Sequence, residues 1–121
     1  MIGIGLDAVD VERFRAALRR HPRLADRVFT PRERADMAGR ADPVPGLAAR
    51  FAAKEATMKA LGVGIGSVRL AEIGVVQAPS GAPSLVTTGR AAARAAALGI
   101  DTFRVSLTHT ATHAGAVVVA E

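Results

Sequence analysis

Cysteine, tryptophan and tyrosine are all absent from the 121 residues, and aromatic residues make up only 3% of the chain. Without cysteine, the chain can form neither a disulfide framework nor a thiolate metal site. Half of the residues are hydrophobic, so the core must be built from Ala, Val, Leu and Ile. A module that stacks single-stranded nucleic acid on aromatic side chains is disfavoured, because the only aromatic residues are scattered: Phe14, Phe29, Phe51 and Phe103.

No apolar run approaches the roughly 20 residues that a helix needs to cross a bilayer. The opening decapeptide MIGIGLDAVD lacks a charged segment before its apolar residues and reaches Asp7 too early for a signal peptide. No linker, repeat or low-complexity tract divides the chain, and its length is typical of one domain. We therefore expect a single cytoplasmic domain over residues 1–121 that does not bind membranes.

Positive charge is in excess and is carried almost entirely by arginine. The net charge is +5, from 16 Lys and Arg against 11 Asp and Glu, and the only lysines are Lys54 and Lys59. Arginine favours bidentate contact with phosphate and carboxylate groups. A basic surface therefore suits nucleic acid, a phosphorylated cofactor or an acidic protein partner. A high-GC genome produces the same arginine bias, so charge alone does not choose among these.

Hydrophobic periodicity and turn residues predict an α+β domain. Thr30, Pro31 and Glu33 have the spacing of a helix capping box with proline at the first helical position. Because the strands come mostly in hairpin-like pairs, we expect an antiparallel sheet packed against a long central helix. The expected helices cover residues 9–20, 31–39, 47–61 and 89–98, and the expected strands cover residues 1–6, 68–78, 84–88, 103–108 and 115–120.

The helix over residues 47–61 carries four charges on an otherwise apolar, alanine-rich sequence. On a helical wheel, Arg50 and Lys54 fall together, and Glu55 and Lys59 fall together about a third of a turn away. A helix this apolar is usually buried, so its charges need partners. The alternative is an ordinary surface helix with i,i+4 ion pairs, such as Glu55 with Lys59.

Asp7 and His109 each stand at the end of an expected strand, where a polar side chain serves either structure or chemistry. Asp7 precedes a helix and is suited to cap it, and a lone histidine is more often a structural hydrogen-bonding residue. Gly3 and Gly5 in the first strand indicate a close approach of another backbone. The glycines of residues 62–66 match neither a P-loop nor a dinucleotide fingerprint, and indicate only a bend or a close approach.

Together, these segments resemble the motifs of one family, the holo-acyl-carrier-protein synthases of the phosphopantetheinyl transferase superfamily. The resemblance runs in order through nearly the whole chain, and its central segment is highly specific. The sequence departs from the family pattern after the glycine turn, where Leu70, Glu72 and Gly74 replace an aromatic residue, Asp and Glu. The matching segments are Gly3-Ile4-Gly5-Leu6-Asp7 with Glu12-Arg13, Arg50-Phe51-Ala52-Ala53-Lys54-Glu55-Ala56 with Lys59-Ala60-Leu61-Gly62, Gly81-Ala82-Pro83, and Val105-Ser106-Leu107-Thr108-His109-Thr110.

The resemblance implies a phosphopantetheinyl transferase fold and Mg²⁺-dependent transfer of phosphopantetheine from coenzyme A to a serine of an acidic acyl carrier protein in fatty acid biosynthesis. It implies that Asp7 and Glu55 bind Mg²⁺ and that Lys59 stabilises charge on the transferring phosphate, so that these three form the catalytic set. It also implies a homotrimer with active sites at subunit interfaces. The implied contacts to coenzyme A, with the turn at 81–83 bordering the adenine, come from Arg50, Lys54, Lys59, Gly62, Gly81, Pro83, His109 and Thr110.

Arginines of the expected helix over 9–20 and of the segment beyond it offer a surface for the carrier, since the family docks it there. Arg13, Arg20, Arg23 and Arg27 form one helical stripe if the helix persists past Pro22. Charge complementarity of this kind acts mainly on the rate of encounter and on the choice of partner. The alternative is a solvated basic face.

Three other functions stay open. The chain could serve a polyketide or peptidyl carrier rather than the fatty-acid carrier, and the motifs do not separate these. A catalytically silent homologue that binds coenzyme A is argued against by the intact set of Asp7, Glu55 and Lys59. A basic nucleic-acid-binding module fits the net charge, but it lacks the aromatic residues for stacking.

Overall fold

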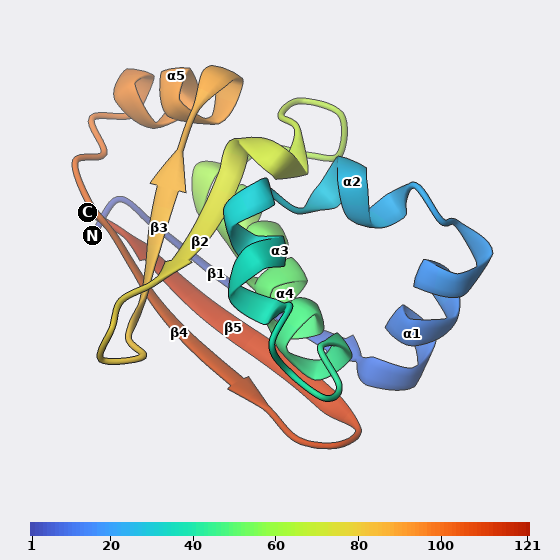
Figure 1. Ribbon diagram of the computed structural model, residues 1–121. Coiled ribbons are helices and arrows are strands. Elements are labelled where there is room, and N and C mark those ends of the chain that lie inside the picture. Colours follow the sequence, from blue (N-terminus) through green and yellow to red (C-terminus); the bar gives the residue numbers. More distant parts are fainter.

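A computed structural model describes residues 1–121 and shows an α+β fold built around one long helix, α4 (Figure 1). Helix α4 packs against one face of a three-stranded antiparallel sheet, and a separate two-stranded antiparallel sheet flanks it. The expected architecture is therefore confirmed. In chain order the elements are β1 (Gly3–Asp10), α1 (Val11–Arg20), α2 (Leu24–Val28), α3 (Pro31–Met37), α4 (Val44–Leu61), the 3₁₀ turn η1 (Leu70–Glu72), β2 (Ile73–Gln77), β3 (Pro83–Thr87), α5 (Gly89–Ala97), β4 (Phe103–His109) and β5 (His113–Ala120).

The three-stranded sheet joins the two ends of the chain, because its strand order is β1-β5-β4. Gly3 pairs with Ala120, and Asp7 pairs with Ala116 in the middle of the sheet. The termini consequently lie beside each other (Figure 1). Asp7 was expected to close the first strand, but β1 continues to Asp10 because β5 is long enough to pair with the whole segment.

Helix α4 and strand β1 touch backbone to backbone, as the strand glycines predicted. A Cβ atom placed on Gly5 would lie 1.8 Å from the carbonyl oxygen of Ala56, and one on Gly3 would lie 2.1 Å from that of Ala60. Only glycine permits this approach. Because alternate residues of a strand face the same side, Asp7 continues the line of Gly3 and Gly5 toward α4.

The first helices pack an aromatic cluster against α4. The rings of Phe14 on α1 and Phe51 on α4 lie 5.2 Å apart between centroids, and Phe29 meets Phe14 edge-on at 6.1 Å. Helix α1 begins two residues later than expected, because the Asp10 carboxylate accepts a hydrogen bond from the amide of Arg13 and caps the helix.

The structure tests three further expectations and adds one helix that was not expected. The capping box of α3 is confirmed, with Thr30 and Glu33 in reciprocal hydrogen bonds. Helix α4 begins at Val44 rather than at residue 47, since Pro45 is tolerated in the first helical turn. The five-residue helix α2 was not predicted. The strand expected over 68–78 begins only at Ile73, because η1 precedes it.

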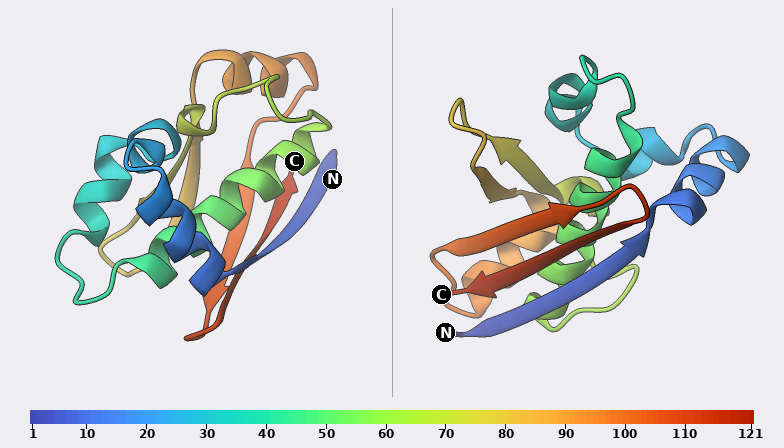
Figure 2. Two further views of the ribbon diagram at one scale, coloured as in Figure 1. Left: turned by 90° about the vertical axis from the view of Figure 1, so that its right-hand side faces the viewer. Right: turned by 90° about the horizontal axis from the view of Figure 1, so that it is seen from below.

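The outer face of the three-stranded sheet carries no helix (Figure 2, right). Exposed apolar side chains of the N-terminal segment line it, and Leu6 keeps 68% of its surface accessible. No helix of the protein is long and apolar enough to cross a membrane.

Candidate active site

Asp7 and Glu55 line one pocket of about 560 Å³ between β1, α1 and α4. Asp7 faces α4 from β1, and Glu55 lies on α4. Phe14 and Phe51 provide an apolar wall, and Arg13 and Arg20 on α1 stand at the same pocket. Two carboxylates from different elements therefore share one solvent-accessible space beside a basic helix.

Lys59 joins this pair from the next turn of α4. Its ammonium donates a 2.8 Å hydrogen bond to the backbone carbonyl of Leu6 and lies 3.3 Å from Oδ1 of Asp7. Its side chain keeps 55% of its surface exposed. The ammonium is thus anchored to the strand, while its remaining donor capacity stays accessible.

The electrostatics of Glu55 suit a cation. Partial burial raises the pKa of Glu55 most, and the nearby charge of Asp7 raises it further, while Lys59 opposes both effects. Two neighbouring carboxylates are the usual protein share of a Mg²⁺ site, which retains waters and substrate phosphates as its other ligands. No group of three or more acidic, histidine or cysteine side chains that could hold a metal is present. The donors present therefore fit a Mg²⁺ ion that shares its coordination with a phosphorylated substrate, and do not form an all-protein cage.

A second pocket, of about 180 Å³, gathers four residues predicted to contact coenzyme A. They come from three elements and one turn: α4 supplies Arg50, the β2–β3 turn supplies Gly81, β3 supplies Pro83, and β4 supplies His109. Exposed Arg40 also lines this pocket, as do Ala49, Gln77 and Leu107. We call it the arginine pocket.

Arg50 lies on the floor of the arginine pocket with only 5% of its surface exposed. Its guanidinium donates to the carbonyl of Gly46 at 3.2 Å and to the side chain of Gln77 at 3.4 Å, but its Nε has no partner. Burial and the charge of Arg40 both lower the pKa of Arg50. A Cβ atom placed on Gly46 would lie 3.7 Å from an Nη atom of each arginine. Two guanidinium groups at one pocket, one of them exposed, suit the binding of an anion.

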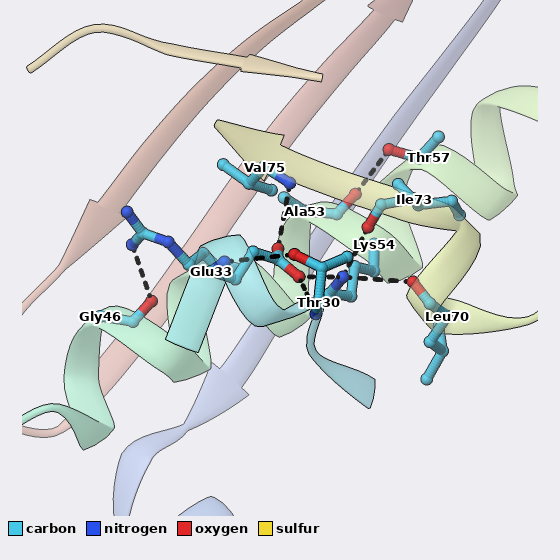
Figure 3. A network of polar contacts seen from close by, with 10 residues as sticks. Thr30, Glu33, Gly46, Ala53, Lys54, Thr57, Leu70, Ile73 and Val75 are labelled. Atoms are coloured by element: carbon cyan, nitrogen blue, oxygen red, sulfur yellow. Dashed lines mark hydrogen bonds and ion pairs between the residues drawn. The ribbon is translucent and has the colours of Figure 1, made fainter. Parts of the chain in front are cut away.

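Lys54 does not reach either pocket, which corrects the expectation that it contacts coenzyme A. Its side chain is fully buried and points inward (Figure 3). The ammonium lies 2.7 Å from Oε1 of Glu33, and it also donates to the carbonyls of Leu70 and Ile73. With its three donors engaged, Lys54 has none left for a phosphate.

Gly62 and Thr110 serve local backbone geometry. Gly62 ends α4 in the left-handed conformation at φ 68°, as predicted for a helix terminus. The Thr110 hydroxyl accepts hydrogen bonds from the amides of Thr112 and His113 in the β4–β5 turn. Neither residue lines the two pockets described above.

The predicted arginine stripe is not one helix. Helix α1 ends at Arg20, and α2 begins at Leu24 after a turn that contains Pro22. The turn nevertheless brings Arg20, Arg23 and Arg27 around a shallow pocket of about 430 Å³. Arg20 also lines the carboxylate pocket together with Arg13, so the basic surface is continuous with the site of Asp7 and Glu55.

Several site residues were not predicted from the sequence. Arg40 and Gln77 of the arginine pocket stand in segments without a recognisable motif, and only the tertiary structure brings them to Arg50. Phe14 and Phe51, for which the sequence suggested no role in a site, form a wall of the carboxylate pocket.

A family model and proteins of known sequence match this chain over nearly its whole length. The family model of the 4′-phosphopantetheinyl transferase superfamily matches residues 3–118. The holo-[acyl-carrier-protein] synthase of Streptomyces avermitilis is 50% identical over 121 residues, covering 100% of this chain and 98% of the relative. That of Moorella thermoacetica is 42% identical, with coverages of 100% and 94%.

Solved structures of holo-[acyl-carrier-protein] synthases share the fold. Holo-[acyl-carrier-protein] synthase from Neisseria meningitidis superposes with a TM-score of 0.90 at 33% identity, covering 100% of this chain and 98% of the other. The Helicobacter pylori enzyme, in complex with coenzyme A, gives a TM-score of 0.83 at 28% identity, with coverages of 98% and 99%. The Bacillus anthracis enzyme, in complex with coenzyme A (3′,5′-ADP), gives 0.82 at 32% identity, with coverages of 99% and 96%.

Proposed function

Because the chain belongs to the holo-[acyl-carrier-protein] synthase family of the 4′-phosphopantetheinyl transferase superfamily, and is therefore a transferase, we propose that it moves 4′-phosphopantetheine from coenzyme A to a serine of apo-acyl carrier protein in fatty acid biosynthesis. Adenosine 3′,5′-bisphosphate is the other product. One observation carries the proposal: Asp7 and Glu55 share a pocket with Lys59 bound to Asp7, beside a surface rich in arginine. Residues 1–121 act as one domain, in the cytoplasm.

Asp7 and Glu55 are the residues that would hold Mg²⁺. When bound, Mg²⁺ neutralises charge on the pyrophosphate of coenzyme A and polarises the phosphoryl group that is attacked. The raised pKa of Glu55 supports this assignment, because a divalent cation relieves the repulsion between the two carboxylates.

The chain's own residues position the reactants and stabilise charge, which is most of what phosphoryl transfer requires. The serine oxygen of the carrier forms a bond to the β-phosphorus of coenzyme A, and the bond from that phosphorus to the bridging oxygen of adenosine bisphosphate breaks. Lys59, anchored to Leu6, binds the negative charge that develops on the transferring group. The serine proton passes to a carboxylate of this pocket, and Glu55, whose pKa is raised by partial burial in the metal-free protein, is the better candidate of the two.

The arginine pocket is proposed to hold the nucleotide phosphates of coenzyme A. A phosphate would accept hydrogen bonds from the guanidinium groups and would offset the repulsion between Arg40 and Arg50. His109 and the turn formed by Gly81 and Pro83 complete the walls.

The two pockets share no residue. Arg50 and Glu55 project from α4 about 140° apart, given about 100° per residue, and therefore serve different sides of the helix. We infer that one coenzyme A spans the carboxylate pocket of one subunit and the arginine pocket of the next, in a homotrimer. The apolar outer face of the sheet, with exposed Ile4 and Leu6, supports such an assembly.

The carrier is proposed to dock on Arg13, Arg20, Arg23 and Arg27, which adjoin the carboxylate pocket. Acidic residues of a carrier would pair with this surface and place the serine near Asp7 and Glu55. A polyketide or peptidyl carrier of similar charge is the alternative substrate.

Intact-mass spectrometry of an apo-acyl carrier protein mixed with coenzyme A, Mg²⁺ and this protein tests the proposal. We expect a mass gain of one phosphopantetheine that disappears when a chelator is added. A gain only on a polyketide or peptidyl carrier would select the alternative substrate. No gain on any carrier, with coenzyme A still bound, would refute transfer and leave a silent homologue.

A further inference from the structure

The buried pair of Glu33 and Lys54 connects three elements, α3, α4 and β2 (Figure 3). Lys54 on α4 donates to Oε1 of Glu33, and Thr30 donates its amide to the same oxygen at 2.9 Å. The second oxygen of Glu33 accepts the amide of Val75 on β2 at 3.0 Å. Both charged side chains are fully buried, so every one of these contacts is made in the interior.

The pair occupies the place that a third strand would take beside β2. The β2–β3 sheet has only two strands, which leaves one edge of β2 without a partner strand. The carbonyl of Ile73 and the amide of Val75 point to the same edge, because polar backbone groups of alternate residues face the same side. Both residues are fully buried, where unpaired backbone groups are costly. Lys54 satisfies the carbonyl and Glu33 the amide.

The hairpin held at this edge carries part of the arginine pocket. Gln77 ends β2, and the turn that follows brings Gly81 and Pro83 to the pocket. On the other side, Arg50 lies one helical turn before Lys54 on α4 and donates to Gln77. The position of β2 along α4 therefore sets the spacing between Arg50 and the walls of the pocket.

Directional contacts fix that position in a way that apolar packing does not. Val75 and Ile73 are aliphatic, and aliphatic side chains pack acceptably at several offsets. Three hydrogen bonds between the Glu33 and Lys54 side chains and the backbone of Leu70, Ile73 and Val75 accept only one register.

We propose that Glu33 and Lys54 are positioning residues for binding of the nucleotide of coenzyme A, and that they act by clamping the β2–β3 hairpin to α4. They touch no substrate. This inference rests on the proposed function, since it assigns the arginine pocket to coenzyme A. It predicts that loss of the pair weakens coenzyme A binding while the chemistry at Asp7 and Glu55 persists.

The test compares a double variant with a control variant. The double variant combines Lys54→Met with Glu33→Gln and so removes both charges together, and the control is Thr57→Val. Thr57 is a suitable control because it is also fully buried on α4, and its hydroxyl donates only to Ala53 within the same helix. If this double variant does not fold, Lys54→Gln combined with Glu33→Gln also removes both charges but keeps polar groups at both positions, so that no unpaired charge is left in the interior. Circular dichroism and thermal melting establish folding for each protein.

We expect the double variant to raise KM for coenzyme A about tenfold and to change kcat less than about threefold. Amides of residues 73–87 are expected to exchange hydrogen faster than in the wild type. Thr57→Val is expected to change neither KM for coenzyme A nor hydrogen exchange in the hairpin, even where its melting temperature falls by a similar amount. Equal KM values in the double variant and the control, or unchanged hydrogen exchange in the hairpin, would overturn the proposal that the pair positions the β2–β3 hairpin.

Failure of the proposed function gives a different result. If the wild-type protein neither binds coenzyme A in calorimetry nor modifies a carrier, the assignment of the pocket is wrong. Hydrogen exchange of residues 73–87 would then still report whether the pair holds the hairpin, so the two failures are distinguishable.

Discussion

The ammonium of Lys59 on α4 lies 3.3 Å from the carboxylate of Asp7 on β1 and donates to the carbonyl of Leu6 beside it. The contact depends on the backbone approach of α4 to β1, since Asp7 continues the line of Gly3 and Gly5. A side chain about half exposed contributes little to stability through such a pair. Its position next to two carboxylates instead suits the binding of a phosphoryl group.

Replacing Lys59 with Met should therefore separate activity from stability. We expect kcat to fall on the order of a hundredfold or more, as for loss of a preorganised charge-stabilising donor, with little change in melting temperature. Steady-state kinetics with an apo-carrier provide the measurement. Arg32→Gln is the matched control, because Arg32 is an exposed cation paired with Asp36 on α3 and lines neither pocket. Equal activity of the two variants would argue against a role for Lys59.

Glu55→Gln should stabilise the metal-free protein at neutral pH. The pKa of Glu55 is raised by burial and by Asp7, so the native state disfavours its ionised form, and stability falls as pH rises above the ordinary value of about 4.3. The variant escapes this loss, and its advantage in melting temperature should shrink when the pH falls to about 4. Melting scans at both pH values check this.

Addition of Mg²⁺ should reverse the order of melting temperatures of the wild type and Glu55→Gln. A ligand that binds only the native state raises its melting temperature, so wild type should gain and Glu55→Gln should not. Equal gains in both proteins would show that Glu55 does not hold the ion.

Arg40→Gln should weaken binding of coenzyme A without affecting folding, because Arg40 is exposed. Loss of one charge-assisted contact to a phosphate amounts to about 1.5 to 3 kcal/mol, so KM for coenzyme A should rise at least about tenfold. The substitution should raise KM for dephospho-coenzyme A less than KM for coenzyme A if Arg40 contacts the 3′-phosphate. Arg32→Gln, an exposed arginine on α3 paired with Asp36, is the control. A similar rise with Arg32→Gln would indicate a general charge effect.

Two inactive variants should restore activity when mixed. Asp7→Asn damages the carboxylate pocket, and Arg50→Met damages the arginine pocket. If each site takes one pocket from each of two neighbouring subunits, trimers formed after joint refolding contain intact sites at about a quarter of the interfaces, as random assembly requires. Activity of the co-refolded mixture is compared with that of each variant refolded alone. No recovery would place both pockets of a site in one subunit.

Gly5→Ala should disturb the frame that brings Asp7 to α4. The added Cβ would meet the backbone oxygen of Ala56, which cannot rotate away, so we expect a loss of about 2 to 3 kcal/mol in unfolding free energy. Gly39→Ala is the matched control, since a Cβ there meets no atom within 4 Å. Urea unfolding compares the two variants. Equal stability would mean that α4 shifts away from β1 at little cost.

Short segments of the sequence specify the features that depend on local physics. The capping box of Thr30 and Glu33 sets the start of α3, Gly62 ends α4 in a left-handed conformation, and the glycines of β1 permit helix contact. These depend on backbone angles and near neighbours, which a short segment specifies. The family motifs singled out Asp7 and Glu55, which the structure places in one pocket.

The contacts of each charge on α4 are set by segments that lie far away in the chain. Lys54 and Lys59 are five residues apart in the same helix, yet one is fully buried against Glu33 and the other remains half exposed at Asp7. Helix α4 has apolar residues on nearly all of its sides, so its sequence does not reveal which side faces the pocket. The partners of Lys54 come from α3 and from the segment at 70–73, far away in the chain. Long-range packing therefore determines whether a charged side chain serves structure or is free to meet a substrate.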